Sequence, residues 1–216
     1  MPQIPAPRRV AILLFPEVEA LDAAGPYEVF TCASRMAQRL APDQPPPFAV
    51  VTLAAEAGPV RARAGLQFGA DQAWAQAAPP DLLLLPGGVV DALCADAQAL
   101  AQIRRLGEGA QIVASVCTGA FVLAAAGLLA PGSQVSTHWE DAADLARAQP
   151  ALRVDATRRY IESADGSRIS SAGIQAGIDM SLHLVARLAD TALAERTARQ
   201  MDVAWQRDPW GGTVLG

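Results

Sequence analysis

The feature that most constrains the fold is the alternation of short, continuously apolar runs with longer segments of helical spacing. Apolar runs of strand length occupy residues 10–15, 49–53, 81–85 and 112–116. Strands that are apolar throughout, separated by helices, are typical of a parallel sheet with both faces covered. We therefore predict an α/β fold with a mostly parallel central sheet.

The rest of the chain fits the same architecture. We expect helices over residues 21–36, 95–108, 118–129, 141–148, 174–188 and 192–201, the first entered through Asp22 and the Gly25-Pro26 pair. We also expect a loop over 41–48, a short strand over 134–137, and hairpins over 59–69 and 159–171. No internal repeat and no Gly/Ser-rich linker divides the 216 residues. We therefore expect one domain over residues 1–216, in which 191–216 form a C-terminal helix and tail.

The composition excludes several functional classes. Hydrophobic residues make up 51% of the chain and charged residues 18%, which provides a sizeable core and excludes disorder. Seventeen basic residues against 22 acidic ones give a net charge of -5, so we expect no nucleic-acid partner. The apolar runs are too short to span a membrane, and prolines interrupt the N-terminus where a signal peptide would be apolar. We expect a cytoplasmic protein that binds no membrane.

Three cysteines occur in the chain: Cys32, Cys94 and Cys117. Their odd number and wide spacing, without a CxxC pair, disfavour a disulfide framework and a structural zinc site. No two histidines share a helix face, and no glycine-rich phosphate loop is present, so we expect neither a metal nor a cofactor. Cys32 and Cys94 fall in helical segments without a neighbouring acid or base, and we interpret both as packing residues.

Cys117 stands at the junction between the strand over residues 112–116 and the helix that opens at Thr118. A cysteine in such a sharp turn is held clear of both elements, as in a nucleophile elbow. The positive end of the helix favours the thiolate, which is the nucleophilic form. The alternative is a small hydrophobic residue buried at the end of a strand.

Asp22 is the candidate acid partner of this thiol. An acid at this position either caps a helix that begins at Gly25 or Pro26, or aims a carboxyl group at the thiol from the neighbouring strand end. In the second case it could orient the sulfur and pass a proton, which requires a raised pKa beside a thiolate. Glu17 and Glu19 compete for this role, although both look exposed to solvent.

Further candidates lie at the ends of other strands. Gly87 and Gly88 follow a run of leucines, and they form either an ordinary tight turn or, with the Thr118 amide, an oxyanion hole. The Thr118 hydroxyl could cap its helix or bind the substrate or a reacting water. His138 is either a general base for Cys117 or a structural group, whereas His183, in an apolar helix, is interpreted as structural.

Taken together, these segments resemble one known superfamily. The ordered motifs LDxxGPxEVF, LLLPGG, SVCTGAFVLAAAGLL, VSTHW and ISSAGIQAGIDMSLHLV are similar to those of the ThiJ/PfpI superfamily, over about residues 9–190. The superfamily is itself similar to class I glutamine amidotransferase domains. Within it, the chain most resembles isocyanide (isonitrile) hydratases and the amidotransferase-like domain of AraC-type regulators.

The resemblance implies a flavodoxin-like three-layer sandwich that forms a homodimer. It also implies a reactive Cys117 contacted by Asp22, with Gly173 and Ile174 at the substrate pocket. Superfamily members of protease type carry a histidine directly after the cysteine, so Thr118 at this position argues against peptidase activity.

The activity that the resemblance implies is cysteine-dependent hydration or hydrolysis of a small carbon–nitrogen substrate. The foremost candidate is hydration of an isocyanide to an N-substituted formamide through a covalent thioimidate, without a cofactor. This chemistry needs an activated nucleophile, a proton donor and a water-accessible but largely apolar pocket. The alternative is a non-catalytic ligand-sensing or redox-responsive domain related to the AraC-type regulators. In either case Trp205 and Trp210 in the tail could cover the pocket, pack on a partner subunit or dock on their own domain.

Overall fold

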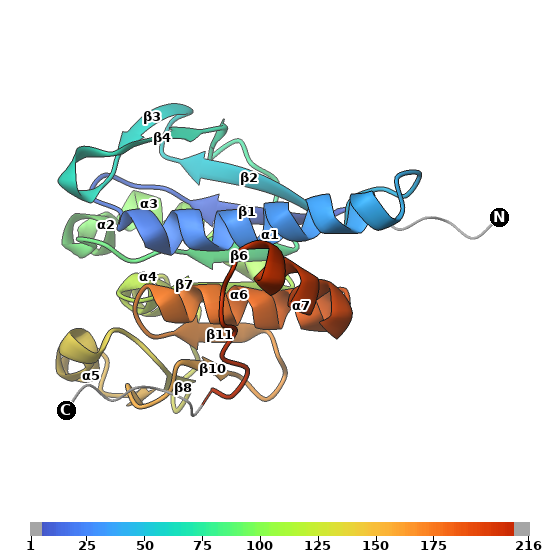
Figure 1. Ribbon diagram of the computed structural model, residues 1–216. Coiled ribbons are helices and arrows are strands. Elements are labelled where there is room, and N and C mark those ends of the chain that lie inside the picture. Colours follow the sequence, from blue (N-terminus) through green and yellow to red (C-terminus); the bar gives the residue numbers. More distant parts are fainter. Residues whose placement is uncertain (1–5, 210–216) are drawn as a thin grey trace.

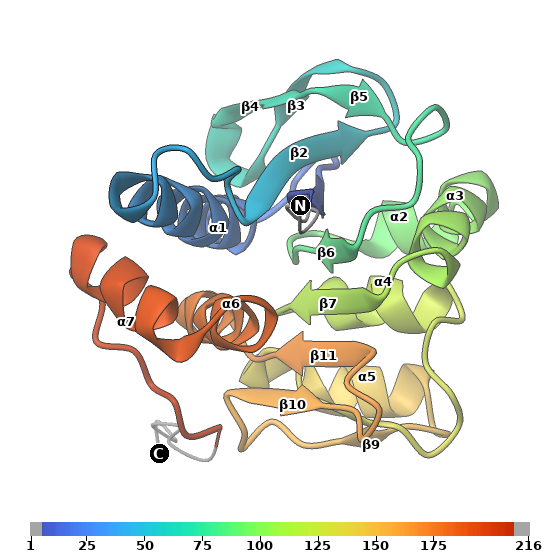
Figure 2. The same cartoon turned by 90° about the vertical axis from the view of Figure 1, so that its right-hand side faces the viewer.

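A seven-stranded sheet forms the centre of the computed structural model, which describes residues 6–209 (Figures 1 and 2). The strand order is β10-β11-β7-β6-β1-β2-β5. Every neighbouring pair is parallel except β10 and β11, which are antiparallel. The predicted α/β fold with a mostly parallel sheet is therefore confirmed.

The strands at the centre of the sheet are the apolar runs of the sequence. The sheet consists of β1 (Arg8–Leu13), β2 (Phe48–Ala54), β5 (Gln72–Ala73), β6 (Leu82–Leu85), β7 (Ile112–Val116), β10 (Tyr160–Glu162) and β11 (Arg168–Ser171). All residues of β6 and β7 are buried, because helices cover both sides. Two smaller pairs lie outside the sheet: the antiparallel hairpin of β3 (Gly58–Arg61) and β4 (Gln67–Ala70), and the parallel pair of β8 (Gln134–Val135) and β9 (Arg153–Val154).

The helices form two layers, one on each face of the sheet (Figure 2). One layer contains α1 (Ala20–Leu40), α6 (Gln175–Leu188) and α7 (Thr191–Gln200), which contact one another. The other contains α2 (Asp91–Ala95), α3 (Ala97–Glu108) and α4 (Gly119–Ala125), while α5 (Ala142–Ala148) packs beside β9. The result is the expected flavodoxin-like sandwich. Within residues 6–209, no helix combines the length and the apolar character that crossing a membrane requires.

The N-terminus of α1 differs from one sequence-based alternative. The helix begins at Ala20, so Asp22 lies in its first turn, and the idea that Asp22 caps a helix beginning at Gly25 or Pro26 is wrong. Pro26 is accommodated inside α1, at the expense of the hydrogen bond that its missing N–H would have donated to the Asp22 carbonyl. Because Asp22 does not cap α1, its side chain is available for a contact outside its own helix.

The C-terminal tail docks on its own chain through a buried acid. Asp179 on α6 is fully buried and forms an ion pair with Arg159. The Trp205 indole N–H donates to the Asp179 carbonyl at 3.2 Å, and the Gln206 amide donates to Asp179 Oδ1 at 2.8 Å. Of the three alternatives for the tail, docking on its own domain is thus the one observed for Trp205, whereas Trp210 lies outside the described residues.

Candidate active site

Cys117 occupies a strained turn between β7 and α4. Its φ angle is +57°, a left-handed conformation that residues with a Cβ atom rarely adopt. The turn is held from two sides, because the Cys117 amide donates to the Ser171 carbonyl at 3.1 Å and Thr137 Oγ1 donates to the Cys117 carbonyl at 2.9 Å. The geometry is that of the predicted nucleophile elbow, with a side chain that is only 8% exposed.

The Asp22 carboxyl group meets this thiol from the first turn of α1. Asp22 is fully buried, and its Oδ2 accepts a hydrogen bond from the Gly87 amide at 3.1 Å. The Cys117 thiol lies close enough to this carboxyl group for each of the two groups to shift the pKa of the other. Within residues 6–209, the second oxygen, Oδ1, is buried and has no hydrogen-bond partner. The structure thus brings Asp22 and Cys117 together, as the sequence predicts.

Burial has a strong effect on the acidity of Asp22. Desolvation raises the pKa of its carboxyl group from 3.8 to about 7, and the negative charge of Glu19 acts in the same direction. The Gly87 amide and the Cys117 side chain act in the opposite direction by hydrogen bonding, with a smaller effect. Near neutral pH, a substantial fraction of Asp22 therefore carries a proton that it can donate.

The thiol of Cys117 is less acidic than we expected. Burial and, with a smaller effect, the negative charge of Asp22 raise its pKa from 9.0 to about 12. The Thr118 amide at the start of the helix does lower the pKa, as we expected, but burial and Asp22 outweigh this effect. Since both pKa values are raised, the pair retains at least one shared proton at neutral pH.

The turn after β6 packs directly against this pair. The Gly87 amide donates to Asp22, and the Gly88 amide donates to Thr118 Oγ1 at 2.9 Å. Thr118 Oγ1 in turn donates to the Gly88 carbonyl at 2.9 Å and makes no capping bond to α4. Since both glycine amides already have acceptors within the protein, the oxyanion hole predicted from them is not open in this conformation.

Gly87 is required here by close packing. A Cβ atom at this position would lie 2.7 Å from both Asp22 Oδ2 and Thr118 Oγ1. Any larger residue would therefore displace the carboxyl group or the hydroxyl that it contacts.

His138 lies beside the elbow without bonding to it. Its Nδ1 is 3.4 Å from Asp141 Oδ2, and in the described part of the chain no hydrogen bond joins the ring to Cys117. A direct general-base role for His138 is therefore not supported by the geometry.

The predicted pocket residues Gly173 and Ile174 do lie near His138. A Cβ atom on Gly173 would lie 2.4 Å from His138 Cδ2, and Ile174, with a φ of +46°, lines the same cavity as Cys117.

A cavity of about 330 Å³ opens onto Cys117. It is lined by Glu19, Arg63, Gly88, Cys117, Thr118, His138, Glu140, Asp141 and Ile174. Three of these side chains are carboxylates, and the single arginine has its Nη1 3.6 Å from the Oε2 of Glu19. The expectation of a largely apolar pocket is therefore wrong, because four of the nine lining residues carry charged side chains.

Three of the lining residues were not predicted from the sequence. Glu140 and Asp141 follow the VSTHW motif directly, so their distance of two and three residues from His138 was an available signal. Arg63 offered no local signal, because it reaches the cavity from the β3–β4 hairpin. By contrast, Glu17, the other acid considered for the role of Asp22, is exposed and does not line this cavity.

The remaining cysteines and the second histidine lie away from this cavity. Cys32 is fully buried in α1, and Cys94 is partly buried in α2. His183 on α6 hydrogen-bonds Glu162 through its Nε2 at 2.8 Å, as a structural histidine does.

The fold is a mostly parallel α/β sandwich, and its candidate site combines a cysteine at a nucleophile elbow with a neighbouring buried carboxyl group. This combination defines a specific class of protein. The chain belongs to the DJ-1/PfpI family, which it matches over residues 8–187. This agrees with the resemblance that the motifs suggest.

Individual relatives differ in what they do. The isonitrile hydratase of Pseudomonas putida is 34% identical over 197 residues, which cover 91% of this chain and 78% of that protein. The HTH-type transcriptional regulator CdhR of Pseudomonas aeruginosa is 36% identical over 149 residues, which cover 68% of this chain but only 43% of the regulator. Among solved structures, a ThiJ/PfpI family protein from Pseudomonas syringae superposes with a TM-score of 0.79 at 27% identity, covering 93% of this chain and 77% of that one.

Proposed function

We propose that the protein is a cysteine-dependent hydratase or hydrolase of small carbon–nitrogen compounds, and that it hydrates isocyanides to N-substituted formamides. The observation that carries the proposal is the close pair of Cys117 and Asp22, in which a buried acid with a raised pKa lies next to a thiol in a strained turn. The similarity to an isonitrile hydratase supports the choice of substrate class.

In the first step, the Cys117 sulfur attacks the terminal carbon of R–N≡C. The proton that Cys117 and Asp22 share is delivered to the same carbon, which gives the thioimidate Cys117–S–CH=N–R and leaves Asp22 ionised. The raised pKa of Asp22 suits this transfer, since a proton donor works best when its pKa lies near the working pH.

In the second step, water adds to the thioimidate carbon. Asp22, now a carboxylate, accepts a proton from the water as the C–O bond forms and passes it to the imine nitrogen, which gives the tetrahedral adduct Cys117–S–CH(OH)–NH–R. The C–S bond then breaks to release the formamide R–NH–CHO, and the proton of the adduct's hydroxyl group returns to the Cys117–Asp22 pair. The overall reaction adds one water molecule to the substrate, and no oxidant or reductant takes part.

Thr118 and the two glycines have a positioning role in this proposal. The Gly87 amide fixes the Asp22 carboxyl group, and the hydroxyl of Thr118 joins the elbow to the Gly88 backbone. The charged walls of the cavity hold water near the reacting carbon and favour substrates with a polar substituent.

A second candidate function is ligand sensing without turnover. The charged cavity favours it, because such walls suit binding of a polar molecule. The occupied amides of Gly87 and Gly88 also favour it, because they leave no open oxyanion hole for turnover. The similarity to an HTH-type regulator supports the same alternative.

The test is turnover of a simple aryl isocyanide by the purified protein, followed as formamide product by chromatography. We expect product from the wild type and from Cys94→Ala, which changes a thiol distant from the cavity, and none from Cys117→Ala. Full activity in Cys117→Ala would refute the covalent mechanism. No product from the wild type, with Cys117 still reactive towards alkylating agents, would favour another small substrate or the sensing function.

A further inference from the structure

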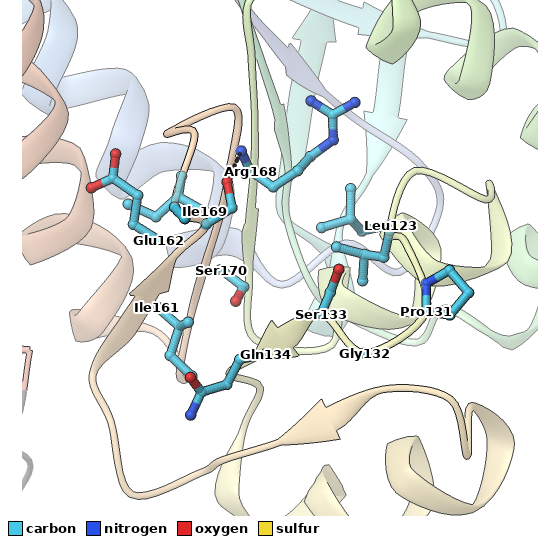
Figure 3. A pocket seen from close by; sticks show the side chains of 13 residues that line it. Leu123, Pro131, Gly132, Ser133, Gln134, Ile161, Glu162, Arg168, Ile169 and Ser170 are labelled. Carbon is cyan, nitrogen blue, oxygen red and sulfur yellow. Dashed lines mark hydrogen bonds between the residues drawn. The ribbon is translucent and has the colours of Figure 1, made fainter.

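A second cavity lies between the β10–β11 hairpin and the segment that joins α4 to β8 (Figure 3). Its volume is about 540 Å³, within the range of small-molecule sites, and it shares no lining residue with the cavity at Cys117. It is lined by Leu123, Leu129, Pro131, Gly132, Ser133, Gln134, Ile161, Glu162, Ser163, Ala164, Arg168, Ile169 and Ser170.

The floor of this cavity is apolar. Leu123 on α4 and Ile161 on β10 are both buried and contribute their side chains to it. Ser133 and Gln134 add neutral polar groups. Such a combination of an apolar surface with a few polar groups is typical of sites for small organic molecules.

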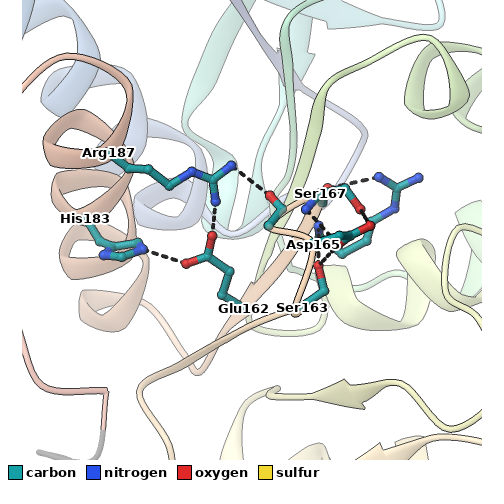
Figure 4. A network of polar contacts seen from close by, with 8 residues as sticks. Glu162, Ser163, Asp165, Ser167, His183 and Arg187 are labelled. Atoms are coloured by element: carbon teal, nitrogen blue, oxygen red, sulfur yellow. Dashed lines mark hydrogen bonds and ion pairs between the residues drawn. The ribbon is translucent and has the colours of Figure 1, made fainter.

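Only two charged side chains belong to the lining, and one of them is neutralised from outside the cavity. The carboxylate of Glu162 is directed towards α6 (Figure 3), where it hydrogen-bonds His183 at 2.8 Å and forms an ion pair with Arg187 (Figure 4). Burial lowers the pKa of His183, so Arg187 is the cation that compensates Glu162 at neutral pH.

Arg168 is the other charged group, and its charge is not compensated. Its guanidinium is held by two neutral acceptors, because Nε donates to the Leu128 carbonyl and Nη1 to the Ser167 carbonyl, both at 2.9 Å. Within residues 6–209, no carboxylate lies within 4.0 Å of it, and Nη2 makes no hydrogen bond. The side chain is half-buried, and partial burial strengthens its attraction for an anion.

We propose that this cavity binds a small organic anion, a carboxylate with an apolar body. The apolar body lies against Leu123 and Ile161, while the carboxylate accepts hydrogen bonds from Arg168 and from the polar groups of Ser133 or Gln134. A guanidinium that keeps a free N–H group is suited to this contact.

The test compares benzoate with benzamide, which has the same shape but no charge, by titration of the 15N-labelled wild-type protein in two-dimensional NMR. We expect benzoate to shift the amide signals of residues 132–134 and 161–170, and to bind at least about tenfold more tightly than benzamide. Equal affinities, no shifts up to about 20 mM benzoate, or shifts confined to the residues around Cys117 would overturn the proposal.

Variants of Arg168 provide the second arm. Arg168→Gln should weaken benzoate binding by about tenfold or more, whereas Arg168→Lys keeps the charge and should lose less. The matched control is Arg153→Gln, which removes an exposed arginine outside the cavity and should bind benzoate like the wild type. Benzoate binding by Arg168→Gln at wild-type affinity would contradict the assignment. If Arg168→Gln does not fold, the comparison of benzoate with benzamide on the wild type still tests whether the cavity prefers an anion.

Discussion

Cys117 and Asp22 have to be considered together, because each changes the acidity of the other. Burial raises both pKa values, to about 12 for the thiol and about 7 for the carboxyl group. A thiolate therefore forms at neutral pH only if its proton stays nearby, on Asp22. The pair is poised to deliver that proton to a substrate carbon once the sulfur attacks.

The first prediction concerns the Asp22→Asn variant. Removing the negative charge removes one of the causes that raise the thiol pKa, so the pKa of Cys117 should fall below about 12. Turnover should nevertheless fall by about 100-fold or more, because the proton donor is lost. The measurements are the pH dependence of Cys117 alkylation by iodoacetamide, followed by peptide mass spectrometry, and formamide production.

The control for this variant is Glu17→Gln, which changes an exposed acid outside the cavity. It should leave both the thiol pKa and the rate close to those of the wild type. If Glu17→Gln and Asp22→Asn slow turnover equally, Asp22 is not the acid.

The second prediction is a pH dependence of stability that comes from Asp22. Its pKa is 3.8 unfolded and about 7 folded, so the folded state binds more protons over this interval. This contribution to the free energy of unfolding is fully present below pH 4 and is lost as the pH rises through 7. The difference amounts to at most about 4 kcal/mol, at about 1.4 kcal/mol for each pH unit.

Urea unfolding of the wild type and Asp22→Asn, each at pH 5 and pH 8, measures this effect. The wild type should lose more stability than the variant between the two pH values, because the variant has no titrating group at this position. Equal losses would show that Asp22 titrates normally in the folded protein. The raised pKa of Cys117 changes the free energy of unfolding only at higher pH, so it does not affect the comparison between pH 5 and pH 8.

At the scale of elements, the turn after β6 connects the acid to the nucleophile. It binds Asp22 through the Gly87 amide and Thr118 through the Gly88 backbone. The carboxyl ends of β6 and β7 are neighbours in the sheet, which brings this turn and the elbow together.

The third prediction follows from the lack of space at this turn. Gly87→Ala should displace the Asp22 carboxyl group or Thr118, and lower turnover by about tenfold or more while costing about 1–3 kcal/mol of stability. The control is Gly69→Ala in β4, where a Cβ atom would meet nothing within 4 Å. Isocyanide turnover and urea unfolding of both variants provide the comparison. Wild-type turnover in Gly87→Ala would contradict the positioning role of this turn.

The sequence predicts these elements well where the pattern is local. The apolar run over residues 112–116, followed by Cys117 and Thr118, fixes the elbow because strand, turn and helix signals are contiguous. The pKa values were not predictable in the same way, since the pKa of Cys117 depends on burial and on Asp22, which lies 95 positions earlier in the chain. Arg63 was missed for the same reason, because it reaches the cavity from the distant β3–β4 hairpin.

At the scale of the whole molecule, the strand order places the candidate site at the carboxyl ends of central strands of the sheet. β7, which carries Cys117, lies between β6 and β11, and the helices α1 and α6 approach from one face. The family and the fold were predictable because the motifs follow the order of these strands and helices. We propose that residues 1–216 form a single domain of this kind.

The fourth prediction concerns assembly. From the family resemblance we propose a homodimer, and the exposed Leu21 and Tyr27 on α1 offer apolar surface to a second copy. Sedimentation equilibrium at micromolar concentration should give about twice the chain mass of 22.5 kDa. A mass of one chain at that concentration would contradict the proposal.

The central claim is that Cys117 bonds covalently to the substrate carbon during turnover. The most direct measurement is rapid acid quenching of the reaction with an aryl isocyanide, followed by mass spectrometry of the peptide that contains Cys117. We expect a transient gain on Cys117 equal to the mass of one isocyanide molecule, without a corresponding gain on Cys32 or Cys94. Formamide production with no adduct on Cys117 at any time point, together with an active Cys117→Ala variant, would contradict it.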